Sequence, residues 1–200
     1  SWGYNNYGQL GNGNTSQSTV PVDVYSSGVL EDKTITQVAG GTFNSMALGN
    51  DGKVYTWGYN YYGQLGNGNN TNSNVPVAVK TSGVLSGKTI IQIAAGEHHC
   101  VALGSDGKVY TWGKNDSGQL GDSTNINSNV PVAVKTSGVL NGKTITQVAS
   151  GASHCVVLGS NGKVYTWGEN GSGQLGNNST TSSNVPVEAS FSQPLPVELI

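Results

Sequence analysis

A tryptophan returns at a fixed interval along this 200-residue chain, each 55 residues after the one before: Trp2, Trp57, Trp112 and Trp167. The residues around it repeat as well, because KVYTWG stands at 53–58, 108–113 and 163–168. Self-similarity at a period of about 50 residues indicates a repeat architecture. We therefore divide the single array 1–200 into the units 2–56, 57–111 and 112–166, with a partial unit 167–200.

Each full unit contains four short segments typical of strands. In the second unit and the start of the third they are 75–79, 89–94, 99–103 and 108–112, and we take 75–79 as the first strand. Pro76 lacks a backbone donor and therefore predicts an edge strand. Asp106-Gly107 indicates a hairpin turn, and no segment has a useful helical period. The sequence predicts an all-β fold.

Four antiparallel strands in a unit of this length are the signature of a β-propeller blade. Since a blade buries its faces only against its neighbours, we expect the recurrent apolar residues to pack between blades. We also expect two histidines at equivalent positions to hydrogen-bond to backbone within or between blades. These structural residues are Trp2, Trp57, Trp112, Trp167, Leu65, Leu120, His99 and His154.

The two halves of the repeat are not equally represented in the chain. Four copies run from the Trp to the VPV segment, but only three run from KTIxQxA to the following DGK turn. The sequence therefore predicts about three and a half blades, in a partial or assembled propeller. An open strand edge invites pairing with another chain, so we expect self-association through the unpaired half-blade.

The composition excludes several classes of partner. Charged residues are 10% of the chain and the net charge is −2, which gives no basic footprint for nucleic acid. No apolar run reaches the roughly 20 residues of a membrane helix. Low charge and abundant Asn, Thr and Ser favour an extracellular or cell-surface location. The chain opens inside a repeat without a methionine, so we expect a mature product, an excised piece or part of something longer.

The sequence offers little for catalysis or cofactor binding. Cys100 and Cys155 follow histidines, but neighbouring residues of a strand point to opposite faces, so we expect buried thiols and no metal site. Asp51 sits in a turn where Asn161 takes its place in another copy, which favours turn geometry over acid–base chemistry. We predict no enzyme activity, no catalytic residue and no cofactor.

The loops after each Trp-Gly differ between copies that are otherwise alike. A constant scaffold with variable loop tips is how repeat proteins form binding surfaces, and tyrosines favour protein recognition. Neutral variation of solvated tips is the alternative, and His98 is interpreted as a solvated surface residue. The candidate protein-contact residues are Tyr4, Tyr7, Tyr59, Tyr61, Tyr62, Lys114, Asp116 and Glu169.

The run WGKNDSGQLG at 112–121, preceded by DGKVYT, resembles the regulator of chromosome condensation repeat, and the resemblance covers nearly the whole chain. It implies a propeller with four-stranded blades, seven in the known members. The connection GVLSGKTI at 83–90 is similar to bacterial members found in secreted or surface proteins. Asn44 departs from the pattern, because the family carries histidine there.

Our first hypothesis is a non-catalytic repeat module for protein–protein interaction or structural assembly, in a bacterial secreted or cell-surface protein. The resemblance also implies two alternatives. One is nucleotide exchange on a small GTPase together with chromatin binding. The other is inhibition of an extracellular enzyme such as a β-lactamase, with Tyr59, Tyr61 and Tyr62 as anchors.

Overall fold

The computed structural model describes residues 1–191 and consists of strands with two single turns of 3₁₀ helix. None of the helical turns in this part of the chain has the length or apolar character needed to cross a bilayer. The elements are η1 (Gly28–Leu30), β1 (Ile35–Gly40), β2 (Asn44–Gly49), β3 (Val54–Gly58), β4 (Ser73–Ala78), η2 (Gly83–Leu85), β5 (Ile90–Ala95), β6 (His99–Gly104), β7 (Val109–Gly113), β8 (Ser128–Ala133), β9 (Ile145–Ser150), β10 (His154–Gly159), β11 (Val164–Gly168) and β12 (Ser183–Glu188).

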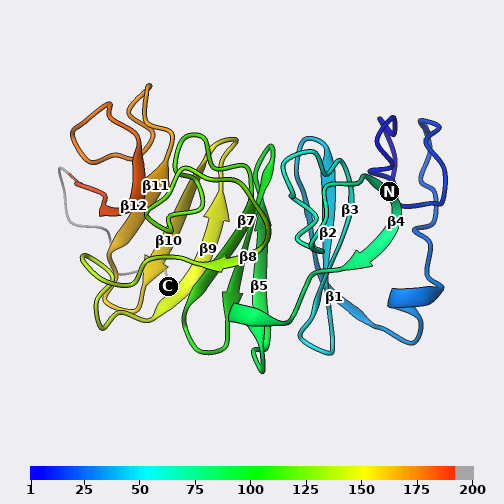
Figure 1. The fold of residues 1–200 in the computed structure, drawn as a ribbon, viewed down its shortest axis with the longest axis horizontal. Coiled ribbons are helices and arrows are strands. Elements are labelled where there is room, and N and C mark those ends of the chain that lie inside the picture. Colours follow the sequence, from blue (N-terminus) through cyan, green and yellow to red (C-terminus); the bar gives the residue numbers. More distant parts are fainter. Residues whose placement is uncertain (192–200) are drawn as a thin grey trace.

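The strands form three antiparallel sheets of four, in the orders β1-β2-β3-β4, β5-β6-β7-β8 and β9-β10-β11-β12. The sheets stand next to one another along the long axis of the molecule (Figure 1). Each sheet comes from one stretch of sequence, as the blades of a propeller do.

The VPV strand lies at the opposite end of its blade from the place we predicted. Residues 75–78 of the predicted segment 75–79 belong to β4, which pairs with β3 and forms the outer edge of the sheet that begins at β1. The long loop after β3 folds back so that Ser73 pairs with Gly58 and Val77 with Thr56. Pro76 lies on this edge strand, where its missing N–H removes no ladder bond.

The same tryptophan contact recurs between each blade and the preceding repeat. The indole N–H of Trp112 donates to the carbonyl of Gln64 at 2.9 Å, and Trp57 and Trp167 make the same bond to Gln9 and Gln119. The glycine two residues after that glutamine lies flat against the indole. These three tryptophans are buried, as are the adjacent Leu65 and Leu120.

Trp2 does not have the packing role that we expected for it. Its side chain is 67% exposed, and the segment around it forms only one isolated bridge, between Gly3 and Ser18. It lines a cavity of about 370 Å³ together with Tyr4 and Leu10. Trp57 pairs with Ser45 of β2 and donates its N–H to Gln9, and in the 55-residue register the given sequence has no counterpart of either residue for Trp2.

His99 contacts side chains of the next blade rather than the backbone groups that we predicted. Its Nε2 lies 3.0 Å from Ser150 Oγ and 3.3 Å from Cys155 Sγ. His154 occupies the equivalent position in the third sheet and is half-buried. In the first sheet Asn44 occupies the position equivalent to His99, and its Nδ2 donates to the Sγ of Cys100 at 3.3 Å.

We call these side-chain contacts between neighbouring blades the seam. Its buried groups are neutral near pH 7. Burial, together with smaller contributions from the nearby His154 and His98, lowers the pKa of His99 to about 3. Burial raises the pKa of the Cys100 thiol to about 12 and that of Cys155 as well. Both cysteines are free thiols. The seam is therefore a packing contact of uncharged side chains.

The Trp-to-glycine contact predicts a difference between two equivalent glycines. A Cβ at Gly121, where φ is +64°, would lie 2.7 Å from Trp167 Nε1, whereas at Gly176, with φ +61°, its nearest neighbour would be 3.8 Å away. Gly121→Ala should lower the free energy of unfolding by about 2 kcal/mol more than Gly176→Ala. Both variants are strained at a positive φ, but only the Gly121 variant also clashes with the Trp167 indole. Urea denaturation measures both, and equal losses would contradict the contact.

The burial of His99 predicts a pH dependence of stability. Below pH 6.5 the unfolded chain takes up a proton that folded His99 excludes until about pH 3, so stability falls as the pH is lowered through this window. Between pH 7.5 and 4.5 this amounts to about 2 to 3 kcal/mol. His99→Asn, which copies Asn44, should lose that part of the dependence in urea titrations. His154→Asn is the comparison: burial also lowers the pKa of the half-buried His154, so this variant should lose a smaller part of the dependence. An unchanged slope in His99→Asn would refute the argument.

Candidate functional site

Two sets of loops lie together at one end of the blades, which we call the loop face. One set follows the Trp-Gly pairs (4–8, 59–63, 114–118, 169–173), and the other joins the first two strands of each sheet (41–43, 96–98, 151–153). The sets are hydrogen-bonded: the amide of Tyr59 donates to the carbonyl of Phe43 at 2.9 Å, and that of Lys114 to His98 at 2.9 Å. The loop face is at the top of Figure 1.

A buried asparagine fixes the shape of each long loop. Asn60 Nδ2 donates to the carbonyls of Asn69 and Thr71, both at 3.0 Å, and its Oδ1 accepts the amide of Leu65 at 2.9 Å. The same three bonds are made by Asn5, Asn115 and Asn170. All four loops therefore have one framework, and only their tips differ.

The tips of the first two repeats form a continuous cluster of seven aromatic rings. The ring centroids of Tyr7 and Tyr59 are 4.7 Å apart, and those of Tyr61 and Tyr62 are 5.0 Å apart at 89°. Two of the rings remain well exposed, Tyr61 at 66% and Tyr4 at 47%. We call this surface the aromatic face; its residues are Tyr4, Tyr7, Phe43, Tyr59, Tyr61, Tyr62 and His98.

His98 and Phe43 belong to this cluster although sequence reasoning did not select them. His98 is not the solvated residue that we expected, because it stacks on Phe43 at 5.3 Å and 11° and lies 5.0 Å from Tyr62. A signal was available: this position is aromatic in the two copies whose tips carry tyrosines and is Ser153 in the third.

The aromatic face is uncharged at neutral pH. Burial lowers the pKa of His98, Glu97 opposes this and Lys114 adds to it. Burial also raises the pKa of Tyr59, with smaller contributions from neighbouring tyrosines. The surface therefore offers ring faces and hydroxyl groups rather than ionic groups.

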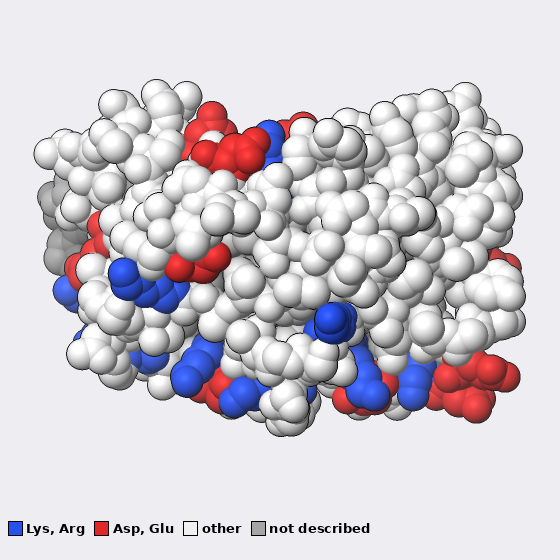
Figure 2. All heavy atoms as spheres, in the orientation of Figure 1, with Lys and Arg blue, Asp and Glu red and all other residues white. Residues whose placement is uncertain are grey.

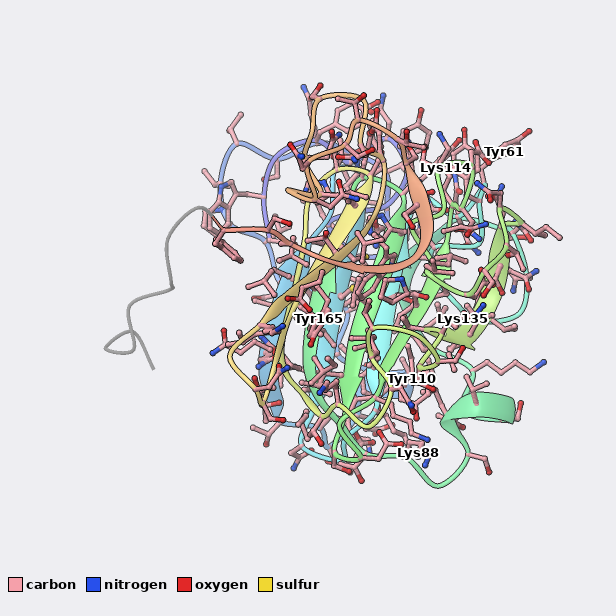
Figure 3. All side chains as sticks on the ribbon, turned by 90° about the vertical axis from the view of Figure 1, so that its left-hand side faces the viewer. Tyr61, Lys88, Tyr110, Lys114, Lys135 and Tyr165 are labelled. Carbon is pink, nitrogen blue, oxygen red and sulfur yellow. The ribbon has the colours of Figure 1, made fainter. Side chains whose placement is uncertain are left out.

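The charged candidates lie to one side of the cluster. Lys114 Nζ stands 5.1 Å from the centroid of the Tyr62 ring and 3.6 Å from a carboxylate oxygen of Asp116. Figure 3 places Tyr61 and Lys114 at the same end of the sheets, opposite Lys88. Glu169 belongs to the loop after β11 and is not part of the cluster. Six of the eight predicted contact residues are thus in direct contact, with Asp116 attached through Lys114.

Comparisons with family models identify the repeat over nearly the whole chain. A model described as the regulator of chromosome condensation (RCC1) repeat matches residues 1–48, 51–103, 106–158 and 161–199. A second model of the same repeat matches 35–64, 90–119 and 145–174.

Curated proteins from animals and plants are similar to the chain. It is 36% identical over 188 residues to the human E3 ubiquitin-protein ligase HERC2, covering 93% of this chain and 4% of that protein. It is 35% identical over 191 residues to the ultraviolet-B receptor UVR8 of Arabidopsis thaliana, covering 96% of this chain and 41% of the receptor. The chain thus spans less than half the length of these relatives.

Solved structures agree with the fold. Human WBSCR16 superimposes with a TM-score of 0.83 at 27% identity, over 95% of this chain and 48% of that one. Prp20p of Saccharomyces cerevisiae, a protein described with its binding properties to Gsp1p and histones, gives 0.77 at 25% identity over 94% and 45%. The predicted all-β propeller architecture and the resemblance to the RCC1 repeat are confirmed.

Proposed function

Because this chain belongs to the regulator of chromosome condensation (RCC1) repeat family, we propose that it is a non-catalytic propeller segment that binds another protein through its aromatic face. The observation that carries the proposal is the joining of seven aromatic rings from two successive repeats into one surface. Tyrosine combines a large apolar ring with a hydroxyl group, and it is enriched in protein interfaces.

The rigidity of the loops supports this role. Each tip is held by a buried asparagine that satisfies three backbone groups, as in the Asn60 loop. Binding to a fixed loop loses little conformational entropy. Side chains that are free to vary on such a framework make a specific surface without altering the fold.

One structural neighbour supports protein binding, whereas the ligase name of another relative supports no catalytic activity for this chain. Prp20p is described with Gsp1p and histones as its binding partners. HERC2 is a ubiquitin ligase, but the chain corresponds to only 4% of it, so the ligase name supports no activity here. A small GTPase found on the aromatic face would favour the exchange-factor alternative, and a secreted hydrolase would favour the inhibitor alternative.

We also propose that the protein belongs to a bacterial cell surface or secreted fraction. The support is compositional: charged residues are 10% of the chain, and solubility rests on Asn, Ser, Thr and Gly. Detection of the protein only in the cytoplasm of its source would refute this location.

A second candidate function, self-assembly, is favoured by one exposed strand. Val38 in β1 is 77% exposed, whereas its equivalents Ile93 and Val148 are 7% and 5% exposed because the preceding blade covers them. The Val38 surface therefore has the shape and polarity that receive another blade. We propose that a second copy of this chain covers it in solution.

Light scattering across a concentration series tests the self-assembly. The mass should rise above the 20.6 kDa of one chain, and Val38→Lys should prevent the rise because a charge would be buried at the contact. Ile126→Lys, at a loop residue that is 73% exposed, is the control. A constant mass of one chain at every concentration would contradict self-assembly and leave the aromatic-face proposal unaffected.

The aromatic face is tested with the double variant Tyr4→Ala/Tyr61→Ala. These two rings are the most exposed of the cluster, so the fold should be retained while affinity falls about 10- to 100-fold, as for aromatic anchors of interfaces. Proteins captured by the wild-type chain are compared with those captured by the variant. The partner that is lost is then purified and titrated.

The matched control is Tyr25→Ala, since Tyr25 is 48% exposed and lies outside the aromatic face. The control should retain the partner with wild-type affinity. If the double variant binds every captured protein as tightly as the wild type does, the aromatic face is not the contact surface.

A further inference from the structure

The two ends of the blades differ in charge. The end formed by the hairpin turns carries most of the lysines, where Lys33 and Lys88 pair with Asp51 at 3.4 Å and Asp106 at 2.9 Å. Figure 2 shows charged side chains along this lower edge and uncharged atoms over the upper part of β1–β4. The lysines of that end are Lys33, Lys53, Lys88, Lys108, Lys143 and Lys163.

The loop face carries fewer lysines. Beside the aromatic cluster stand two carboxylates, Glu97 next to His98 and Asp116 next to Lys114, against the one lysine Lys114. Burial keeps His98 neutral at pH 7, as described above. The aromatic face is therefore bordered by a net negative rim.

The aromatic face already binds one cation of its own. Lys114 Nζ stands 5.1 Å from the Tyr62 ring centroid, within the range of a cation–π interaction. The rings of Tyr4 and Tyr61 have no such occupant in the described structure and remain exposed. These 200 residues contain no arginine, so a guanidinium group on these rings has to come from outside them.

We propose that the aromatic face recognises a basic, arginine-bearing segment of a partner protein, whose guanidinium groups stack on the exposed tyrosine rings and face the acidic rim. This inference rests on the proposed function and names the chemistry of the partner. Arginine fits better than lysine because its guanidinium is planar and weakly hydrated and stacks on aromatic rings. The rim contributes complementary charge, which speeds encounter and fixes orientation.

Other classes of partner fit this surface less well. Phosphates of a nucleic acid would meet Glu97 and Asp116 rather than several cations, and nucleic-acid binding depends on cations. A second copy has most of its lysines at the opposite end of the blades and has no arginine within these 200 residues.

The test uses the intact chain and three synthetic peptides of equal length in a Gly/Ser background. They carry arginine, lysine, or citrulline as the neutral isostere of arginine, and binding is measured by isothermal titration calorimetry at low and high salt. The arginine peptide should bind several-fold more tightly than the lysine peptide, and the citrulline peptide should not bind measurably. Equal binding of arginine and citrulline peptides, or no binding of any peptide, would overturn the inference.

Two substitutions locate the site. Tyr61→Ala should weaken arginine-peptide binding about five- to tenfold, whereas Tyr25→Ala should leave it unchanged. Lys114→Gln should tighten binding about threefold, because it removes a competing cation and a like charge. Equal effects of Tyr61→Ala and Tyr25→Ala would show binding by overall charge and refute the site.

The outcomes separate this inference from the proposed function. A partner that is lost in Tyr4→Ala/Tyr61→Ala but binds without arginine would keep the proposed function and remove the arginine chemistry. Failure of both the partner comparison and the peptide titration would remove both.

Discussion

The indole of each repeat, held against the Gly-Gln-Leu-Gly turn of the repeat before it, is the interaction on which the rest of this structure depends. The two partners lie in different repeats, since the N–H of Trp112 donates to the carbonyl of Gln64, 48 residues earlier. The glycine that follows permits both a positive φ and the close approach of the ring. Order within one blade therefore requires the neighbouring repeat, as in other repeat arrays.

This dependence separates the residues that may vary from those that may not. The asparagine at the start of each loop and the Gly-Gln-Leu-Gly turn at its end are fixed by hydrogen bonds to the same backbone groups in all four copies. The residue before the asparagine and the two after it contribute only backbone groups to this network, as the amide of Tyr62 does to Gln64, and their side chains take no part in it. Tyrosines at 59, 61 and 62, and Lys114 and Asp116 in the next copy, therefore alter the surface and leave the framework unchanged.

The strands could be predicted because their signals are local. The Asp-Gly turn before Lys108 and the apolar alternation around it define β6 and β7 within one or two residues. The position of β4 could not be read in the same way, because Ser73 pairs with Gly58 only after a loop of fourteen residues folds back. His98 was missed for a related reason: its burial comes from Phe43 and Tyr62, which belong to other loops.

The division between core and surface also decides which chemistry is open to this molecule. His99 and Cys155 meet at 3.3 Å, a combination that can form a nucleophile where solvent reaches it. Here both are fully buried, and burial holds each in its neutral form, whereas a reactive thiol needs its ionised form and access. The accessible variation lies instead in rings, hydroxyls and a few carboxylates at the loop tips. Such groups recognise a partner by stacking and hydrogen bonding, which makes binding the activity to which this arrangement of residues is suited.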